Sequence, residues 1–259
     1  MPDQSAPSPQ VRYRSPEDGM AGPEDYPDAP ISIVCERHTP GAGLFGVMVA
    51  IGGDIPLHHH SMMEFQFVLS GTGLALDADG GEEPIGPGGT VLSPAGPTGA
   101  HGFRNTGPLP LTLLCVYPSP GGATPDRSPF DPAVDPGAGP RSVYVGPDDV
   151  RAVSAAHRGE GVVAGRIIDE HVDGAELFAE LLSVPGELGR QRHAAHELLY
   201  VVTGTGVAST DDGRELELRP GGLLSCPAGQ GGAHAIRNAG SLPLQLLSIL
   251  PSASGGFPG

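Results

Sequence analysis

The sequence lacks tryptophan and lysine altogether, and only 5% of its 259 residues are aromatic, so any core must be largely aliphatic. Helices are disfavoured, because 41 glycines and 29 prolines interrupt the chain and both residue types weaken a helix. No run of about 18 apolar residues occurs, and the first 20 residues contain no apolar signal segment, so we expect neither a membrane span nor a leader. This composition is typical of short strands joined by turns.

Basic residues are scarce, since 14 arginines stand against 30 acidic side chains and the formal net charge is −16 at pH 7. Such a surface argues against DNA, RNA or an anionic membrane as a partner, because these bind basic patches. The cysteines Cys35, Cys115 and Cys226 are scattered and form no CxxC pair. Neither a disulfide framework nor a thiolate zinc site is therefore indicated. We expect a soluble, cytoplasmic protein.

An internal repeat organises the chain. A shift of 133 residues places 41–117 on 174–250 without a gap, and about 32 of the 77 aligned positions are identical. The stretch SPAGPTGAHGFRNTGPLPLTLL in the first copy meets CPAGQGGAHAIRNAGSLPLQLL in the second. Identity at this level indicates duplication, and a half of about 130 residues is large enough to form a domain.

The repeat and the composition divide the chain into five predicted segments. An N-terminal arm is followed by a first domain, a linker rich in proline and glycine, a second domain and a C-terminal tail; the boundaries are 1–30, 31–118, 119–140, 141–250 and 251–259. The arm is interpreted as mobile or as a strand laid on the other half. The similarity of YRSPED (13–18) to YVGPDD (144–149) indicates that each domain begins before its best-matching segment.

Short apolar stretches alternate with turn signals inside each repeat. In the first copy LFGVMVAI, FQFVLSGTGLAL, GTVLSP and LPLTLLCVY are separated by GGD, DADGG, GPGG and NTGP. Many short strands with such turns favour an antiparallel sandwich or barrel. A helical period is present only weakly, around 147–157.

Histidines cluster at matching places in the two repeats. In the first repeat, Gly52 is followed after five residues by His58, and then come His60, Glu64 and Gly71. Alternation along a strand places His58 and His60 on one side, while His59 points away. A turn through residues 61–63 can return Glu64 to the same pocket.

A second group of residues follows in the same repeat. Gly88 is followed after five residues by Pro94, and then by Gly96, His101 and Asn105. For the histidines to meet, His101 must come from a strand distant from the first group.

These two groups resemble the two sequence motifs of the cupin superfamily. The first group fits G-x5-HxH-x3-E-x6-G at every position, and the second fits G-x5-PxG-x2-H-x3-N except that four residues separate Gly96 from His101. The resemblance covers both halves and implies an all-β fold of two tandem jelly-roll barrels related by duplication, a bicupin. It also implies a metal in the barrel mouth.

The residue types in the first repeat suit a divalent transition metal. Three imidazoles and one carboxylate, from His58, His60, His101 and Glu64, can fill four positions of an octahedron and leave two for water, substrate or dioxygen. Fe(II) is favoured, with Mn(II), Ni(II), Co(II) or Zn(II) as alternatives. Because the ligands carry one negative charge, a bound dication leaves the site positive and suited to an anionic or enolisable ligand.

The second repeat departs from this pattern. His193, Glu197 and His234 align with His60, Glu64 and His101, but Gln191 replaces His58. Three interpretations stay open: a metal site that uses these residues with or without Gln191, a relic that stabilises the barrel, or the true active site with a labile ligand. His196, next to Glu197, is expected to face away.

Two further pocket residues are suggested by strand parity. Gln66 shares the parity of Glu64, and Phe103 shares that of His101, so each can line the site or merely fill the barrel. Glu64 and Gln66 are the catalytic candidates, with Glu64 also a proton acceptor. Cys115 and Cys226 lie in apolar strands without a basic partner nearby, so buried, unreactive thiols are expected.

The leading functional hypothesis is a mononuclear non-haem metal dioxygenase acting on a small enolic or phenolic substrate. The alternatives are a redox-neutral metal-dependent cyclase of the aromatic-polyketide type or an isomerase or epimerase, and a non-catalytic binding protein. The resemblance alone does not choose among them. The two barrels are expected to pack against each other as in a cupin homodimer, and whether such units form a further homo-oligomer stays open.

Overall fold

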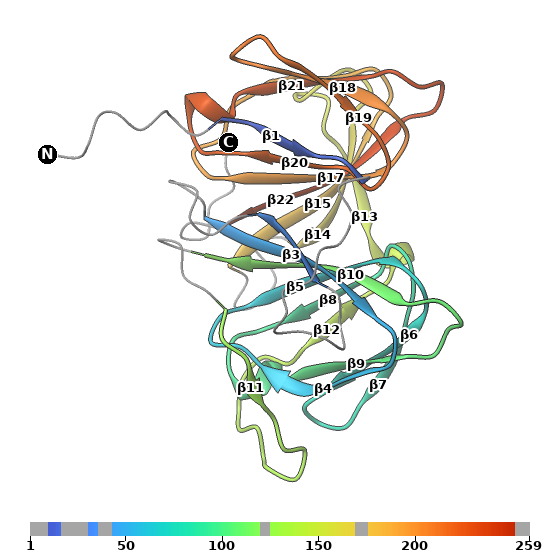
Figure 1. The fold of residues 1–259 in the computed structure, drawn as a ribbon, viewed down its shortest axis with the longest axis vertical. Coiled ribbons are helices and arrows are strands. Elements are labelled where there is room, and N and C mark those ends of the chain that lie inside the picture. The colour runs from blue at the N-terminus through green and yellow to red at the C-terminus, as the bar shows by residue number, and fades with distance from the viewer. Residues whose placement is uncertain (1–9, 17–30, 36–42, 120–124, 169–175, 252–259) are drawn as a thin grey trace, which may run out of the picture.

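The computed structural model describes residues 10–16, 31–35, 43–119, 125–168 and 176–251. Within them the chain forms four antiparallel sheets stacked as four layers (Figure 1). The six-stranded and seven-stranded sheets lie in the middle, and the five-stranded and four-stranded sheets form the outer layers. The predicted all-β fold of two tandem jelly-roll barrels is confirmed, because each half pairs one large sheet with one small sheet.

The first barrel holds a large sheet in the order β12-β8-β5-β10-β3-β2 and a small sheet in the order β11-β4-β9-β6-β7. Its strands are β2 (Ile31–Cys35), β3 (Leu44–Ile51), β4 (Asp54–His59), β5 (Glu64–Ser70), β6 (Gly73–Asp77), β7 (Glu82–Ile85), β8 (Thr90–Ser93), β9 (His101–Asn105), β10 (Leu111–Pro118), β11 (Ser128–Pro129) and β12 (Val143–Val145). A 3-10 turn at Pro97–Gly99 precedes β9.

The second barrel repeats this plan, with a large sheet in the order β1-β20-β17-β22-β15-β14-β13 and a small sheet in the order β16-β21-β18-β19. Its strands are β1 (Arg12–Arg14), β13 (Arg151–Ser154), β14 (Val163–Ile168), β15 (Leu177–Val184), β16 (Glu187–Gln191), β17 (Glu197–Thr203), β18 (Gly206–Thr210), β19 (Glu215–Leu218), β20 (Leu223–Cys226), β21 (His234–Asn238) and β22 (Leu244–Pro251). The weak helical period near 147–157 corresponds to a 3-10 turn at Pro147–Asp149 followed by β13.

Strand β10 shows why the central strands are apolar on both faces. Leu113, Cys115 and Tyr117 enter the core of the first barrel, whereas Leu114 and Val116 enter a different core. That second core lies between the two barrels and includes residues of both repeats. A strand buried on both sides loses the alternation of polar and apolar residues that marks a half-exposed strand, which explains the continuous run LPLTLLCVY.

The core between the barrels makes the two repeats one packed unit. Phe65 and Leu114 of the first repeat and Leu198 and Leu247 of the second are all fully buried there. Burial of such side chains contributes roughly 1.5–3 kcal/mol each. The expected packing of the two barrels against each other is therefore observed between the two large sheets (Figure 1).

The leading segments of the two repeats are exchanged between the barrels. Strand β1 pairs with β20 of the second barrel, and β12 pairs with β8 of the first. Residues 143–145 therefore lie in the sheet of the first barrel, although the boundary predicted at residue 141 assigns them to the second domain. Of the predicted arm 1–30, only 10–16 is described, and its β1 lies on the other half of the chain.

Matching tyrosines complete this exchange. Tyr144 of β12 covers Gly89, and Tyr13 of β1 covers Gly222, which are the last glycines of the two PGG turns. A Cβ on Gly89 would lie 2.6 Å from the Tyr144 hydroxyl oxygen. The similarity between 13–18 and 144–149 thus marks a pair of equivalent strands that each close the barrel of the other repeat.

The segment predicted as linker also takes part in the fold. Its residues 120–124 lie outside the described part of the chain, but β11 pairs with β4, and Phe130 N–H donates to the Leu57 carbonyl at 3.0 Å. The predicted tail 251–259 lies outside the described residues except Pro251. Among the residues described, no helix has the length and apolar character needed to cross a membrane.

We expect Gly89→Ala to destabilise the fold, because the new Cβ forces the Tyr144 ring away and loosens β12. Overpacking of this kind costs about 1–3 kcal/mol. Gly53→Ala is the matched control, since its Cβ would meet no atom within 4 Å. Urea unfolding measures both, and equal stabilities of the two variants would contradict the packing role assigned to Tyr144.

Candidate metal centre

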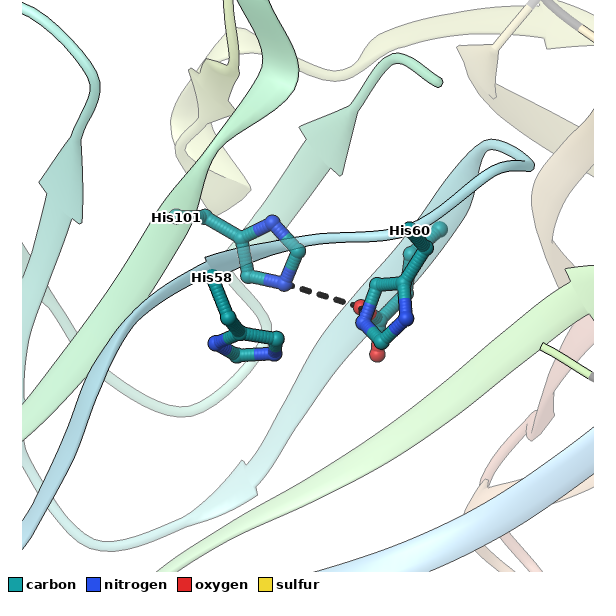
Figure 2. A group of neighbouring side chains, drawn as sticks. His58, His60 and His101 are labelled. Atoms are coloured by element: carbon teal, nitrogen blue, oxygen red, sulfur yellow. Dashed lines mark ion pairs between the residues drawn. The ribbon is translucent and has the colours of Figure 1, made fainter. Parts of the chain in front are cut away.

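Four predicted ligands come together where the two sheets of the first barrel meet. His58 lies on β4, opposite His101 on β9 in register, so both stand on the small sheet. His60 follows the end of β4, and Glu64 begins β5 of the large sheet. Figure 2 shows His58, His60 and His101 arranged around one centre, where a dashed line marks the contact between His101 Nε2 and a carboxylate oxygen of Glu64. His59, predicted to point away, is not among the four residues that could hold an ion.

The ligand atoms of these residues form a compact group. One nitrogen of each histidine and one carboxylate oxygen of Glu64 all lie within 4.8 Å of one another. Glu64 Oε2 is 3.0 Å from His60 Nε2 and 2.9 Å from His101 Nε2. The four residues are 7% exposed or less. The predicted convergence of His58, His60, Glu64 and His101 is therefore present.

Backbone carbonyls determine which nitrogen of each ring faces the centre. The Nδ1 atom of His58 lies 2.9 Å from the Pro56 carbonyl oxygen, and that of His101 lies 3.0 Å from the Gly99 carbonyl oxygen. The Nδ1 atom of His60 contacts the Asp126 carbonyl oxygen. Because a carbonyl accepts only, each Nδ1 carries a proton, and a neutral ring then turns an unprotonated Nε2 toward the centre.

This arrangement fits a cation. His60 Nε2, His101 Nε2 and Glu64 Oε2 are buried without a hydrogen-bond partner in the described part of the chain. With Nδ1 protonated, the neutral imidazoles and the carboxylate all present lone pairs to the same small volume. A dication among them satisfies every lone pair, and three imidazoles with one carboxylate are ligands that divalent transition metals take.

Burial and mutual contact set the charge states. Burial, assisted by His101, lowers the pKa of His58 to about 3, so this ring is neutral. Burial opposes ionisation of Glu64, but His101 and His60 outweigh it and hold the pKa of this carboxyl well below its usual value. Burial lowers and Glu64 raises the pKa of His60, with a net increase. Metal binding therefore competes with a proton at His60.

A tyrosine that sequence reasoning missed holds the carboxylate. Tyr117 Oη donates to Glu64 Oε1 at 2.6 Å. Glu64 thus has one oxygen engaged by the tyrosine and the other turned toward the histidines. Burial and the negative charge of Glu64 raise the pKa of Tyr117 well above its ordinary value, so the phenol keeps its proton. The only sequence pattern that could have indicated Tyr117 is its spacing of two residues from Cys115, which places both side chains on the same face of β10.

Other predicted residues lie deeper in the barrel. Gln66 is fully buried, and its side-chain amide lies 3.4 Å from Ser93 Oγ rather than within the four-ligand group. Phe103 is also buried, and its ring centre is 6.0 Å from that of His101. Cys115 is buried as expected, and burial raises its pKa well above the ordinary value.

The linker segment covers the outer side of the site. Asp126 contacts His60 through its carbonyl and accepts the Ser61 N–H at 2.7 Å through Oδ1. Arg127 follows, and its charge lowers the pKa of His58 and His60 in addition to burial. The composition of this segment predicts only a spacer, and contacts between residues about 65 positions apart leave no local signal in the sequence.

The second barrel holds a less complete group. Glu197, His234 and Cys226 lie within 4.8 Å of one another, and His193 Nε2 is 3.2 Å from Glu197 Oε2. The ring centres of His193 and His234 are 6.4 Å apart, compared with 5.5 Å for His60 and His101. Cys226, predicted to be a buried thiol, is buried, and its place beside Glu197 follows from the pairing of β17 with β20.

The predicted ligand Gln191 is engaged elsewhere. Its Oε1 accepts a hydrogen bond from Arg158 Nη2 at 2.9 Å, and the same nitrogen is 3.8 Å from Glu197 Oε1. Arg158 also pairs with the buried Glu180. A guanidinium cation therefore lies beside the carboxylate of the second barrel, on the side where His58 stands in the first.

Together these features define a duplicated β-barrel protein with a buried three-histidine, one-carboxylate centre in its first barrel. The sequence matches the family model described as cupin domain over residues 46–117 and 181–250, and the chain belongs to the cupin family. The predicted resemblance to a two-domain cupin is confirmed. A search of curated proteins finds no matching sequence.

Solved structures share the fold of the whole chain. Protein YlbA from E. coli has a TM-score of 0.69 at 14% identity, covering 95% of this chain and 92% of its own. A mutant of oxalate decarboxylase from Bacillus subtilis has a TM-score of 0.69 at 15% identity, covering 99% and 80%. The Lactobacillus farciminis oxalate decarboxylase in complex with formate has a TM-score of 0.66 at 18% identity, covering 95% and 87%.

Removal of one ligand tests the centre of the first barrel. We expect metal-stripped protein to bind Mn(II) and to melt at a higher temperature once loaded. His60→Ala should weaken this binding about 100-fold or more, because one of four ligands is lost. His59→Ala, which alters the neighbouring histidine outside the group, should bind like the parent. If calorimetric titration gave the same Mn(II) affinity for both variants, His60 would not be a metal ligand and the proposed centre would be contradicted.

His196, in the second barrel, makes the stability of the fold depend on pH independently of the metal centre. This ring is buried, its Nε2 is 2.7 Å from Ser225 Oγ, and burial lowers its pKa to about 4. Between about pH 6.5 and 4 the unfolded chain binds a proton that the folded chain does not, so stability falls as pH decreases. Between these pH values the free energy of unfolding of His196→Gln should fall by about 2–3 kcal/mol less than that of the parent, as measured by urea unfolding at each pH. An equal fall in the two proteins would contradict the role assigned to His196.

Proposed function

We propose that the protein is a mononuclear metal-dependent enzyme whose first barrel oxygenates a small enolic or phenolic substrate. The observation that carries this proposal is the ligand set of His58, His60, Glu64 and His101, with its lone pairs directed at one buried centre. Four protein ligands leave two positions of an octahedral ion for exogenous ligands. Iron in such a site supplies Lewis acidity and redox chemistry with dioxygen.

The residues around the centre favour an anionic substrate. Glu64 brings the only negative charge of the ligand set, so a loaded site is positive and attracts an enolate, phenolate or carboxylate. Arg127 adds a further positive charge near His58 and His60. Tyr117 fixes the carboxylate through one oxygen and keeps its own proton, which restricts Glu64 to one oxygen directed at the centre.

Gln66 and Glu64 remain our catalytic candidates. Glu64 is our candidate proton acceptor for a substrate hydroxyl, because it is the only carboxylate of the ligand group and is ionised. Gln66 lies on the same strand as Glu64, and its side-chain amide is 3.4 Å from Ser93 Oγ; its proposed role is to hydrogen-bond a substrate bound at the centre. Phe103 and the aliphatic barrel core exclude water from the interior of the barrel.

A redox-neutral reaction is the second candidate. It is supported by the fold shared with oxalate decarboxylases and by the Mn(II) centres of the Bacillus subtilis enzyme. The same centre would polarise a carbonyl and stabilise an enolate in a decarboxylation, cyclisation or isomerisation. A protein that binds a small molecule without converting it is the third candidate.

Oxygen consumption separates these candidates. Protein prepared anaerobically and loaded with Fe(II) is expected to take up dioxygen with 2,4-pentanedione or catechol, measured with an oxygen electrode. Glu64→Ala and His60→Ala should each reduce the rate by at least 100-fold, and His59→Ala should leave it unchanged. Turnover of substrate without oxygen favours the redox-neutral reaction, and a spectral change of bound catechol without product favours the binding protein.

A further inference from the structure

The second barrel has a buried thiol at the place where its ligand group is incomplete. Cys226 on β20 lies directly opposite Glu197 on β17, so the two side chains share one face of the sheet. Ligand atoms of Glu197, Cys226 and His234 all lie within 4.8 Å of one another, and each of these residues is 1% exposed or less. The sulfur therefore belongs to the same buried group as the carboxylate and the imidazole.

Two substitutions distinguish this group from that of the first barrel. The shift of 133 residues places Gln191 on His58 and Cys226 on Ser93. In the first barrel His58 belongs to the four-ligand group, whereas Ser93 Oγ lies against the amide of Gln66. The second barrel has thus lost an imidazole on its small sheet and gained a sulfur on its large sheet.

Gln191 does not fit the ligand position that the alignment gives it. Its Oε1 accepts a hydrogen bond from Arg158 Nη2 at 2.9 Å, so the amide oxygen faces the guanidinium. The amide nitrogen carries two hydrogens and has no lone pair for a metal. Arg158 is itself paired with the buried Glu180. The position that an imidazole fills in the first barrel therefore provides no ligand in the second.

Lone pairs nevertheless converge beside Cys226. Glu197 Oε2 is 3.2 Å from His193 Nε2 and 3.3 Å from His234 Nε2. All three atoms are buried and have no hydrogen-bond partner among the described residues. Nδ1 of His234 lies 2.9 Å from the Gly232 carbonyl oxygen and carries the proton, so the neutral ring presents a lone pair at Nε2. A cation among these atoms satisfies them all.

The donor set differs in kind from that of the first barrel. We propose that His193, Glu197, His234 and Cys226 hold one zinc ion in a closed, four-coordinate site that stabilises the second barrel. Thiolate ligands select zinc over Mn(II), and four protein ligands are the usual number for structural zinc. The thiolate and the carboxylate together match the two charges of the ion. This proposal does not rest on the function proposed for the first barrel.

Zinc binding displaces the proton of the Cys226 thiol. Burial and the charge of Glu197 raise the pKa of this thiol well above its ordinary value, so the sulfur is protonated in the metal-free protein. The sulfur–zinc bond forms as the S–H bond breaks, and the proton passes to the solvent. No oxidant or reductant takes part, because zinc and sulfur keep their oxidation states.

Cobalt(II) is the probe of this site, because its bond to a thiolate gives a sulfur-to-cobalt charge-transfer band in the near ultraviolet. Metal-stripped parent protein should develop this band, although the ligand group of the first barrel contains no sulfur. In His60→Ala, where the first centre is disabled, the band should saturate at one Co(II) per chain. Addition of zinc should abolish the band by displacing the cobalt.

Cys226→Ser tests the sulfur directly. This variant should lose the band and bind zinc about 100-fold more weakly, as measured by competition with a chromophoric chelator. The fold should tolerate serine, because Ser93 occupies the same position in the first barrel. Cys115→Ser is the matched control, since it removes a buried thiol from the first barrel and should keep both the band and the zinc affinity.

The results for the two barrels can be separated. Mn(II) binding to the first barrel should be the same in Cys226→Ser as in the parent, so failure of the first centre would not affect the zinc result. The proposal would be overturned by the absence of the band at saturating Co(II) or by a band that persists in Cys226→Ser. Equal zinc affinities of Cys226→Ser and Cys115→Ser would also overturn it.

Discussion

The buried carboxylate of Glu64, facing the lone pairs of three imidazoles, is the constraint on which the first barrel depends. A carboxylate in an apolar interior is costly unless it is paired. Here Tyr117 engages one oxygen, His60 and His101 approach the other, and backbone carbonyls fix the orientation of the rings. A dication would neutralise the charge of the carboxylate and coordinate the lone pairs of the three imidazoles at the same time.

The second barrel meets the same constraint in another way. Its carboxylate Glu197 accepts from Ser248 Oγ at 2.6 Å and has the guanidinium of Arg158 3.8 Å away. Arg158 lies 33 residues before Gln191, in a part of the repeat outside the aligned segment. The two duplicated barrels therefore share one fold but differ at this carboxylate. Glu64 of the first barrel faces three histidines, whereas Glu197 of the second has the permanent cation of Arg158 beside it. The shared core between the large sheets packs the two barrels against each other.

Sequence reasoning predicted the features that depend on local spacing. The repeat, the short strands and the four ligands of the first barrel follow from motifs that alternation along a strand converts into geometry. It missed contacts made across the fold. Tyr117 contacts Glu64 across 53 residues, and Asp126 contacts His60 across 66. Arg158 engages Gln191, which is one of the candidate ligands of the second barrel. For the arm, a strand on the other half was one of two predicted alternatives, and β1 takes that place. The matching exchange of β12 was not predicted, because a strand of three residues carries no signal for its pairing partner.

The most direct test of the central claim is the position of a bound ion. Crystals of the protein loaded with Mn(II) should give an anomalous diffraction peak in the first barrel, at a coordination distance of roughly 2.0–2.2 Å from His58 Nε2, His60 Nε2, His101 Nε2 and a carboxylate oxygen of Glu64. A loaded crystal without a peak among these four side chains, or with its only peak elsewhere in the molecule, would contradict the account.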